Sequence, residues 1–321
     1  MEPAILGIDI AKEKFDVALL RGEKVTTGRF SNTTAGFGML KRWLAKHGTD
    51  RVHACLEATG TYGEALAEHL HRAGHVVSVV NPARIKGFGQ SELSRTKTDK
   101  ADAQLIARFC SAMKPEPWQP PAPEVKELQS LVRRLEALNG MLEQEKNRLE
   151  TADDVIKESI KRVIKYLQQE IKATRKLIRN HIDRHPDMRG KRDLLESIPG
   201  IGPGTSAMIL AEFGDVSRFP DAGSMASFCG LTPRHRQSGS SVRGRSMISK
   251  TGSSRIRKAL FMPALASIRY NPVIAALRAR LRASGKHPLV IVCAIMRKLI
   301  HIAFGVLKSG RPFDPSIAAA H

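Results

Sequence analysis

The chain of 321 residues carries 52 Lys and Arg against 31 Asp and Glu, a formal charge of +21, and 42% of its residues are hydrophobic. This length allows two or three domains with real cores, and the charge favours a polyanionic partner. The excess is uneven, because residues 188–321 hold 21 of the basic residues and only 6 of the acidic ones. A generally basic protein of the ribosomal type would spread its charge more evenly.

The chain shows no pattern of secretion or membrane insertion. Its first residues, MEPAILGID, lack a basic region followed by an apolar run, so we expect no signal peptide. No uninterrupted apolar run of about 18 residues predicts a membrane span. The cysteines are far apart and form no CxxC pair, which predicts reduced thiols and argues against a zinc site. We therefore expect a cytoplasmic protein without a membrane partner. The four cysteines are Cys55, Cys110, Cys229 and Cys293.

The first third alternates between short apolar runs and amphipathic stretches, separated by turn residues such as Gly22 and Gly74. In chain order we predict strands over 4–9, 14–20 and 24–30, a helix over 35–47, a strand over 51–57, a helix over 61–74, a strand over 75–80 and a helix over 99–113. The order βββαβαβα is that of an α/β ribonuclease H-like (RuvC-like) domain, which we assign to residues 1–114.

The next segments predict a linker and a long helical element. Residues 115–123 contain five prolines, which no helix or sheet continues through. Residues 124–187 show apolar residues at alternating spacings of three and four, which predicts an α-helical hairpin or coiled coil with a break near 150–156. Two helices packing within one chain explain the pattern, but we favour a segment that makes the protein a homo-oligomer, a dimer or a tetramer.

Residues 188–321 predict a mostly α-helical C-terminal domain. Within residues 194–212 a helix ends, a Pro-Gly-Ile-Gly turn follows and a second helix starts, which is the spacing of a helix-hairpin-helix. Its backbone N–H groups are expected to contact a nucleic-acid phosphate, although an ordinary Gly-rich connection is the alternative. The residues expected at this contact are Gly200, Gly202 and Thr205.

Further helices are predicted over 259–268, 273–283 and 288–307. The last is apolar enough to be a buried helix, and its three basic residues argue against a membrane span. These residues are Arg297, Lys298 and His301.

Four acidic residues in the first domain predict a metal site. Asp9 ends the first strand and Glu57 ends the fourth, which lies beside the first in this topology. Asp99 and Asp102 start the last helix and share one face. Four converging carboxylates would repel one another unless cations neutralise them, and two Mg²⁺ ions would do so and support phosphodiester chemistry. Singly, such residues also serve as turn formers or helix caps. Asp16 is expected to face solvent.

Basic and hydroxyl residues predict further contacts with nucleic acid. Three cations near the carboxylates are expected to guide a strand, with a solvated surface as the alternative: Lys86, Arg95 and Lys97. Residues 233–258 form a loop rich in Ser, Gly and Arg that is typical of phosphate binding; the residues expected to contact phosphate are Arg234, Arg236, Ser240, Ser241, Arg243 and Arg245, followed by Arg255, Arg257 and Lys258. A hydroxyl held among guanidinium groups can also attack a phosphodiester, and Ser238 is one candidate.

Six ordered motifs carry a resemblance: GIDIAKEKFDV, EATGTY, KTDKADA, SIPGIG, FCGLTPR and SGSSVRG. In this order they resemble the DEDD-type transposases of bacterial insertion sequences, the bridge-RNA-guided (seek-RNA) recombinases related to the pilin-gene invertase. The resemblance covers nearly the whole chain. It implies a RuvC-like domain, a coiled-coil dimerisation segment and a C-terminal transposase domain.

The resemblance also implies the chemistry. By motif, the family's Mg²⁺-binding carboxylates fall on Asp9, Glu57, Asp99 and Asp102, and its covalent serine nucleophile falls on Ser238. It implies donor and target DNA as substrates and an element-encoded non-coding guide RNA as partner. It further implies an active site completed by a neighbouring subunit.

Two other functions remain open at this point. A Holliday-junction nuclease would use the same metals with water as nucleophile, and the Ser-Arg loop would only bind phosphate. A non-enzymatic, dimeric nucleic-acid scaffold would need only the charge and the coiled coil.

Overall fold

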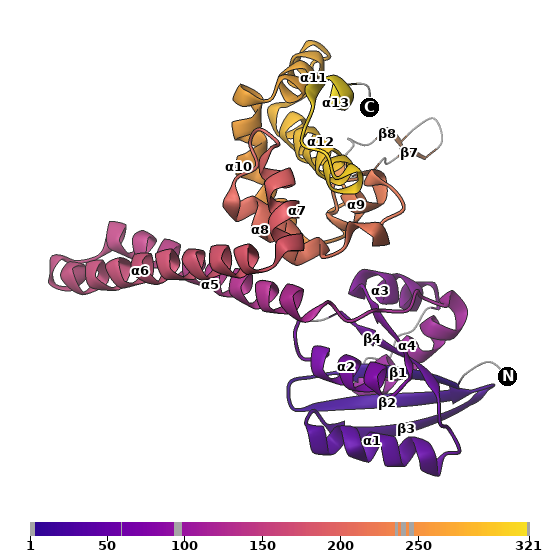
Figure 1. Ribbon diagram of the computed structural model, residues 1–321. Coiled ribbons are helices and arrows are strands. Elements are labelled where there is room, and N and C mark those ends of the chain that lie inside the picture. Colours follow the sequence, from indigo (N-terminus) through magenta and orange to yellow (C-terminus); the bar gives the residue numbers. More distant parts are fainter. Residues whose placement is uncertain are drawn as a thin grey trace. The chain divides into compact units, whose positions relative to one another are not determined.

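The computed structural model describes residues 4–58, 60–92, 98–234, 237–238, 242–243 and 247–319 (Figure 1). The chain divides into two compact units, Met1–Pro120 and Pro121–His321.

The first unit is built on a five-stranded mixed sheet of order β3-β2-β1-β4-β5. Strand β1 pairs antiparallel with β2 and parallel with β4, β2 pairs antiparallel with β3, and β4 pairs parallel with β5. This order is consistent with the predicted nuclease-like topology. The strands are β1 (Ala4–Ile10), β2 (Lys14–Arg21), β3 (Lys24–Ser31), β4 (Val52–Glu57) and β5 (Val76–Val80).

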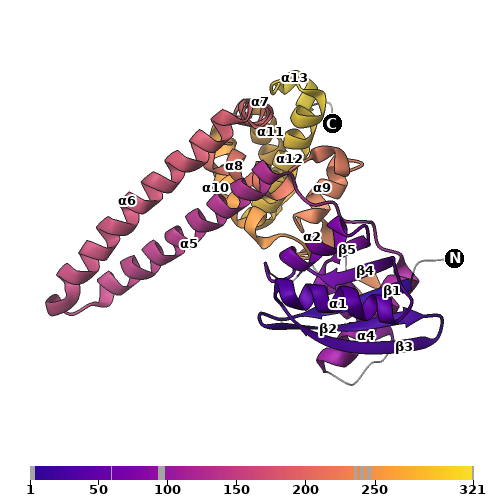
Figure 2. The same ribbon diagram turned by 60° about the horizontal axis from the view of Figure 1, so that its bottom comes forward.

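Helices cover both faces of this sheet. α1 (Thr34–Lys46) and α2 (Glu64–Arg72) bury Phe37, Leu40 and Leu66 against the Phe15 side of the sheet. α4 (Asp99–Met113) packs on the other face, against β1 and β2, and Figures 1 and 2 show it opposite α1.

Within the first unit, the sequence prediction missed the helix α3 (Pro82–Ser91). The Asn-Pro pair after β5 was interpreted only as a strand end. The Asn81 side-chain oxygen instead accepts the Ala83 N–H at 2.8 Å, and Pro82 occupies the first helical turn, where its missing N–H costs no hydrogen bond. α3 packs beside α4, with Phe88 against Phe109. The element order is therefore βββαβαβαα.

Gly7 explains how closely α4 approaches the sheet. A Cβ atom at this position would lie 2.2 Å from the Ala103 carbonyl oxygen and 2.3 Å from the Ala107 backbone nitrogen. Ala18, Ala103 and Ala107 form a small-residue cluster at the same contact. Only glycine permits this approach, which brings the start of α4 against the β1 and β2 backbones.

The proline-rich segment is not a free tether. Ser78 Oγ donates to the carbonyl oxygens of Pro115 and Glu116 at 3.0 and 2.8 Å, and the Trp118 N–H donates to the Val77 carbonyl at 2.6 Å. The segment therefore packs along β5 at the edge of the sheet.

The second unit begins with a helical hairpin formed by α5 (Pro123–Thr151) and α6 (Asp154–Arg184) (Figure 2). The break between them falls at residues 152–153, within the predicted region. Leu138 and Leu142 pack against Leu167 and Ile171 along its length. The structure therefore shows the two helices of one chain packing on each other.

The remainder of the second unit is a helical body around α12 (Pro288–Ser309). α12 is long and apolar enough to cross a membrane, yet more than half of its apolar window is buried, as in a core helix. The other helices are α7 (Pro186–Glu196), α8 (Pro203–Phe213), η1 (Val216–Arg218), α9 (Ala222–Phe228), α10 (Ser254–Tyr270), α11 (Pro272–Ala283) and α13 (Pro315–Ala319).

Candidate functional site

Strand register places a row of charged residues across the sheet of the first unit. Asp9 on β1 lies opposite Asp16 on β2, and Asp16 lies opposite Arg29 on β3. On the other side, β1 and β4 pair Ile8 with Leu56, so Asp9 and Glu57 follow as the next neighbours. All four residues share the sheet face of Gly7, since side chains two apart on a strand point the same way. This is the face that α4 covers.

α4 contributes two more carboxylates at its N-terminus. Thr98 caps the helix by accepting the Ala101 N–H at 3.2 Å, and Asp99 and Asp102 occupy the first turn. Burial, followed by repulsion from Asp102, Asp99, Glu57 and Asp16 in that order, raises the pKa of Asp9 from its ordinary 3.8 to about 6. The fold thus brings the four predicted carboxylates into one electrostatic neighbourhood.

The prediction that Asp16 faces solvent is wrong. Asp16 is only 6% exposed, and its carboxylate accepts the Arg29 Nε–H at 2.9 and 3.2 Å. Strand β2 is covered on both faces, so its residues are buried in succession and alternation gives no signal. The two-residue turn at Gly22 and Glu23 does fix the β2–β3 register, from which the pairing of Asp16 with Arg29 follows.

Two cations, Lys14 and Arg29, lie beside Asp99 in the first turn of α4. Lys14 Nζ lies 2.7 Å from Asp99 Oδ2, and an outer nitrogen of Arg29 lies 3.7 Å from the same oxygen. The Lys14 ammonium, more than Arg29, holds the pKa of Asp99 below its ordinary value. The sequence analysis did not single out Lys14 or Arg29.

The donor chemistry of this site fits divalent cations. Carboxylate oxygens are the ligands that Mg²⁺ prefers. Burial and then repulsion from the neighbouring carboxylates raise the pKa of Asp9, and a bound cation would relieve the repulsion. Among the described residues, no three carboxylate, imidazole or thiol side chains are arranged closely enough to enclose an ion. Asp99 is held by Lys14 instead.

The predicted strand-guiding cations are only partly described. Lys86 is exposed on α3. Arg95 and Lys97 lie outside the described residues.

The Ser-Arg loop of the second unit contains two short antiparallel ribbons. β6 (Pro233–Arg234) pairs with β9 (Met247–Ile248), and β7 (Gln237–Ser238) pairs with β8 (Val242–Arg243). Ser238 lies opposite Val242, so the candidate nucleophile sits on a backbone ladder and not in an open loop. Its side chain and those of Arg234 and Arg243 lie outside the described part, as do Arg236, Ser240, Ser241 and Arg245 entirely.

Comparisons with known proteins cover both units. A DEDD-type family model described as "Transposase" matches residues 6–154, and one described as "Transposase IS116/IS110/IS902 family" matches residues 192–279. The chain is 37% identical to the pilin gene-inverting protein of Moraxella bovis over 320 residues, 99% of each chain. The chain belongs to the IS110 family of transposases. It is also 24% identical to the transposase for insertion sequence element IS1328 of Yersinia enterocolitica over 349 residues, 97% of this chain and 98% of that one.

Family membership makes this transposase an enzyme of DNA recombination, with DNA as its substrate. Family membership therefore argues against the alternative of a non-enzymatic nucleic-acid scaffold. A DEDD-type domain also suggests the use of a divalent metal.

In the transposase, α7 and α8 flank the turn that the sequence predicts as a helix-hairpin-helix. Gly200 has φ +104° in the turn, and a Cβ there would lie 2.7 to 3.0 Å from Ser267 on α10. Glycine is therefore required at position 200 by the backbone conformation and by the packing on α10. Gly202 caps α8 and has open space around its Cα, and Thr205 donates its N–H to the Gly202 carbonyl at 2.9 Å. Phosphate contact at this turn stays a prediction.

Two of the three predicted phosphate-binding cations of α10 are engaged within the transposase. Arg255 forms ion pairs with Glu136 and Glu212, each at 2.6 Å, and so ties α10 to α5 and α8. Arg257 donates to the carbonyl oxygens of Cys229 and Gly252 at 2.9 and 3.1 Å. Lys258 is exposed. Of the three, Lys258 is the best placed to contact nucleic acid.

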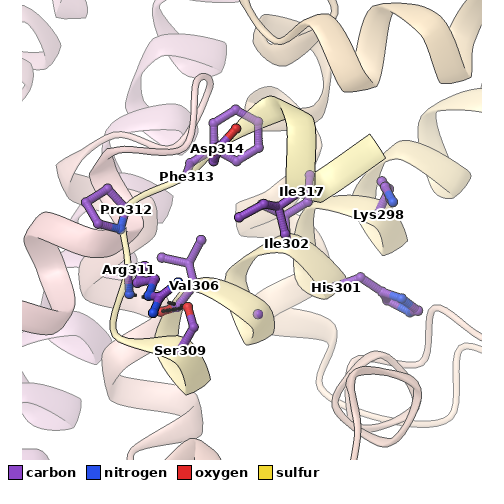
Figure 3. Close-up of a pocket in the computed structure, with 11 residues that line it drawn as sticks. Lys298, His301, Ile302, Val306, Ser309, Arg311, Pro312, Phe313, Asp314 and Ile317 are labelled. Atoms are coloured by element: carbon purple, nitrogen blue, oxygen red, sulfur yellow. Dashed lines mark hydrogen bonds between the residues drawn. The ribbon is translucent and has the colours of Figure 1, made fainter. Parts of the chain in front are cut away.

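The second unit also holds a cavity of about 470 Å³ (Figure 3). Ile302 and Val306 of α12 face Ile317 across it, with Lys298 and Arg311 among the residues around it. Of the predicted site residues that the structure describes, none lines this cavity, so it contributes nothing to the assignment of the carboxylates or of Ser238.

Proposed function

We propose that this transposase cuts and exchanges DNA strands with Asp9, Glu57, Asp99 and Asp102 as a Mg²⁺ site and Ser238 as the covalent nucleophile. The observation that carries the proposal is the strand register that puts Asp9 beside Glu57 under the first turn of α4. The matching motifs, which lie in the segments covered by the two family models, support it.

The four carboxylates would hold two cations at the carboxyl ends of β1 and β4. When bound, Mg²⁺ would supply Lewis-acid stabilisation of the charge that builds up on the reacting phosphate. Glu57 and Asp9 are supported by neighbouring strands, and Asp99 and Asp102 by one helix turn, so regular backbone elements carry all four proposed ligands.

Ser238 would attack the scissile phosphorus through its hydroxyl oxygen. The Oγ–P bond forms while the bond between phosphorus and the 3′ oxygen breaks, and the leaving oxygen takes up a proton to become a 3′-hydroxyl. The hydroxyl proton of Ser238 passes to a base or to water. Neighbouring arginines of the loop would neutralise the phosphate during the attack. The product is a phosphoserine link to the 5′ end of the downstream fragment, while the upstream fragment ends in the 3′-hydroxyl.

A covalent-adduct assay tests this proposal. DNA carrying an end of the element that encodes this transposase is incubated with protein and Mg²⁺ and then run on a denaturing gel. We expect a protein–DNA adduct that is lost in Ser238→Ala. Metal-dependent cleavage without an adduct would contradict the serine mechanism and leave the junction nuclease that uses water.

We further propose that a non-coding RNA from the flank of the element selects the DNA targets, as the family resemblance implies. The protein would then bind RNA shape and backbone, while base pairing reads sequence. Sequencing the RNA that copurifies with the transposase from cells carrying its native flanking DNA tests this. One discrete RNA with loops matching flank and insertion site is expected. Heterogeneous RNA, or none, would contradict guidance.

The carboxylates and Ser238 belong to different units of the chain, and we propose that a neighbouring subunit of a dimer or tetramer supplies Ser238. Mixing Ser238→Ala protomers with Asp9→Ala protomers should then restore part of the activity, because a mixed assembly contains one intact site. No rescue at any mixing ratio would contradict the shared site.

We also propose that exchange proceeds without free double-strand ends. A relative covered over 99% of its length is named for inverting a pilin gene, and inversion requires cut ends to stay held until they are rejoined.

A further inference from the structure

The Arg29 guanidinium is held on one side and open on the other. Its Nε–H donates to both oxygens of Asp16, at 2.9 and 3.2 Å, while an outer nitrogen lies 3.7 Å from Asp99. The Arg29 side chain is 58% exposed, whereas Asp16 is buried. The buried carboxylate of Asp16 therefore fixes the Nε side of the exposed Arg29 guanidinium. This guanidinium lies beside the carboxylate row, the group formed by Asp9, Glu57, Asp99 and Asp102.

This pairing is poorly explained by stability. Ion pairs with an exposed partner contribute little to stability, whereas removing a carboxylate from water is costly. Asp16 also adds negative charge directly beside Asp9, its partner across the β1–β2 pairing. An arrangement that crowds a fifth carboxylate into the row gains little from its ion pair alone. What it does provide is a fixed direction for the Arg29 guanidinium.

We propose that Arg29 binds a non-bridging oxygen of the scissile phosphate, and that Asp16 is the positioning residue that aims it. The inference rests on the proposed function, because it takes the carboxylate row as the place where the phosphodiester is cut. A guanidinium suits this role, since its planar set of N–H donors matches phosphate oxygens and keeps its charge at any working pH.

Asp99 marks where the phosphate would lie. In the structure its carboxylate is the anion next to the outer nitrogen of Arg29, at 3.7 Å, and next to Lys14, at 2.7 Å. A phosphate oxygen at the same rim would meet the same two cations. Arg29 would then stabilise charge on the reacting phosphate from the β3 side, opposite the Glu57 end of the row.

A phosphorothioate experiment tests the contact. Single-turnover cleavage is measured on element-end DNA in which either non-bridging oxygen of the scissile phosphate is replaced by sulfur, with the copurified RNA present. The proteins are the wild type, Arg29→Gln, Arg29→Lys and Asp16→Asn, and Lys24→Gln serves as the matched control, an exposed cation on the same strand. Circular dichroism and thermal melting check that each variant is folded.

For the wild type we expect one isomer to be cut about tenfold more slowly than unmodified DNA, with no rescue by Mn²⁺, the loss expected for one charge-assisted hydrogen bond. Arg29→Gln should cut unmodified DNA about 10²-fold more slowly and lose that discrimination. The cleavage rate of Asp16→Asn should fall between those of the wild type and Arg29→Gln. Arg29→Lys should recover only part of the wild-type rate, and Lys24→Gln should match the wild type.

The isomer preference separates a contact from a structural role. If Arg29→Gln is slow but keeps the wild-type preference, or if it cuts normally, the inference is wrong. If Glu57→Gln also cuts like the wild type, or the wild type needs no metal, the proposed function fails and the inference fails with it. Loss of preference in Arg29→Gln beside an inactive Glu57→Gln supports both.

Discussion

At the scale of single residues, negative charge is concentrated where the carboxyl ends of β1 and β4 meet the first turn of α4. Asp9 lies between Asp16 and Glu57 on neighbouring strands and below Asp99 and Asp102 on α4, and its pKa is raised to about 6. A carboxyl whose pKa is higher in the folded protein favours folding when protonated and opposes it when ionised. The site therefore works against stability at neutral pH, as sites arranged for function often do.

Asp9→Asn should consequently stabilise the metal-free protein at neutral pH. In EDTA at about pH 8, we expect its melting temperature to exceed that of the wild type by a few degrees, because the buried charge is gone. The advantage should shrink as the pH falls through about 6 toward 4, where Asp9 of the wild type becomes protonated. Differential scanning fluorimetry across this range measures it. A variant less stable than the wild type at pH 8 would contradict the charge repulsion.

Lys14 and a divalent ion should compete for Asp99. Because Lys14 Nζ lies 2.7 Å from Asp99 Oδ2, Lys14→Met should release the carboxylate and raise Mn²⁺ affinity about three- to fivefold, the worth of a partly exposed ion pair. Titration followed by electron paramagnetic resonance measures free Mn²⁺. Lys12→Met, an exposed lysine two residues away, is the control and should leave the affinity unchanged. Weaker Mn²⁺ binding by Lys14→Met would show that Lys14 supports the metal site.

At the scale of elements, the contact between α4 and the sheet determines where Asp99 and Asp102 lie. It depends on Gly7, since a Cβ there would lie 2.2 Å from the Ala103 carbonyl. Gly7→Ala should therefore displace α4, lower stability by about 1–3 kcal/mol and abolish metal binding. Gly38→Ala on α1, where a Cβ meets open space, should do neither. Chemical denaturation and Mn²⁺ titration test both variants. Normal Mn²⁺ binding by a folded Gly7→Ala protein would contradict this dependence.

Arg255 and Lys258, three residues apart on α10, should behave differently. Arg255→Ala removes ion pairs to Glu136 and Glu212 and leaves both carboxylates without this cation, so we expect a loss of stability of about 1–3 kcal/mol. Lys258→Ala should leave stability unchanged and reduce the salt dependence of nucleic-acid binding by about one counterion. Denaturation and filter-binding titrations at several salt concentrations measure the two effects. The reverse pattern would contradict these roles.

Much of the element pattern could be predicted because it depends on local signals. The five strands followed from apolar runs bounded by turns, and the hairpin break at 152–153 followed from the interrupted apolar spacing. α3 was missed because Asn81-Pro82 is equally a strand end and a helix start, and packing on α4 decides between them. The ribbons around Ser238 are only two residues long, and their pairing depends on contacts across the loop.

The grouping of the four carboxylates could be predicted because it follows from the order of motifs and elements along the chain. Asp9, Glu57, Asp99 and Asp102 were predicted from motif and chain order. Strand order brings Asp9 beside Glu57, and the packing of α4 brings Asp99 and Asp102 near Asp9. Metal binding by the four stays a prediction. Asp16 was misjudged because β2 is buried on both faces, so alternation along the strand could not reveal its orientation. Its partner Arg29 becomes evident only from the register of the hairpin.

At the scale of the whole molecule, charge and chemistry are divided between two units. The carboxylates belong to the first unit, whereas Ser238 belongs to the second, within residues 188–321 that hold 21 of the 52 Lys and Arg. This division suits the proposed function, in which the second unit would supply most of the charge that attracts nucleic acid and the carboxylates of the first unit would hold the metal.

The most direct test of this account measures strand cleavage of element-end DNA as a function of Mg²⁺ concentration for Glu57→Gln. Glu23→Gln, which changes an exposed carboxylate in the β2–β3 turn, is the matched control. We predict Mg²⁺-dependent cleavage by the wild type and by Glu23→Gln, and none by folded Glu57→Gln at any Mg²⁺ concentration. Cleavage by Glu57→Gln at the wild-type rate, or cleavage by the wild type in EDTA, would contradict the assignment of the carboxylate row as the catalytic metal site.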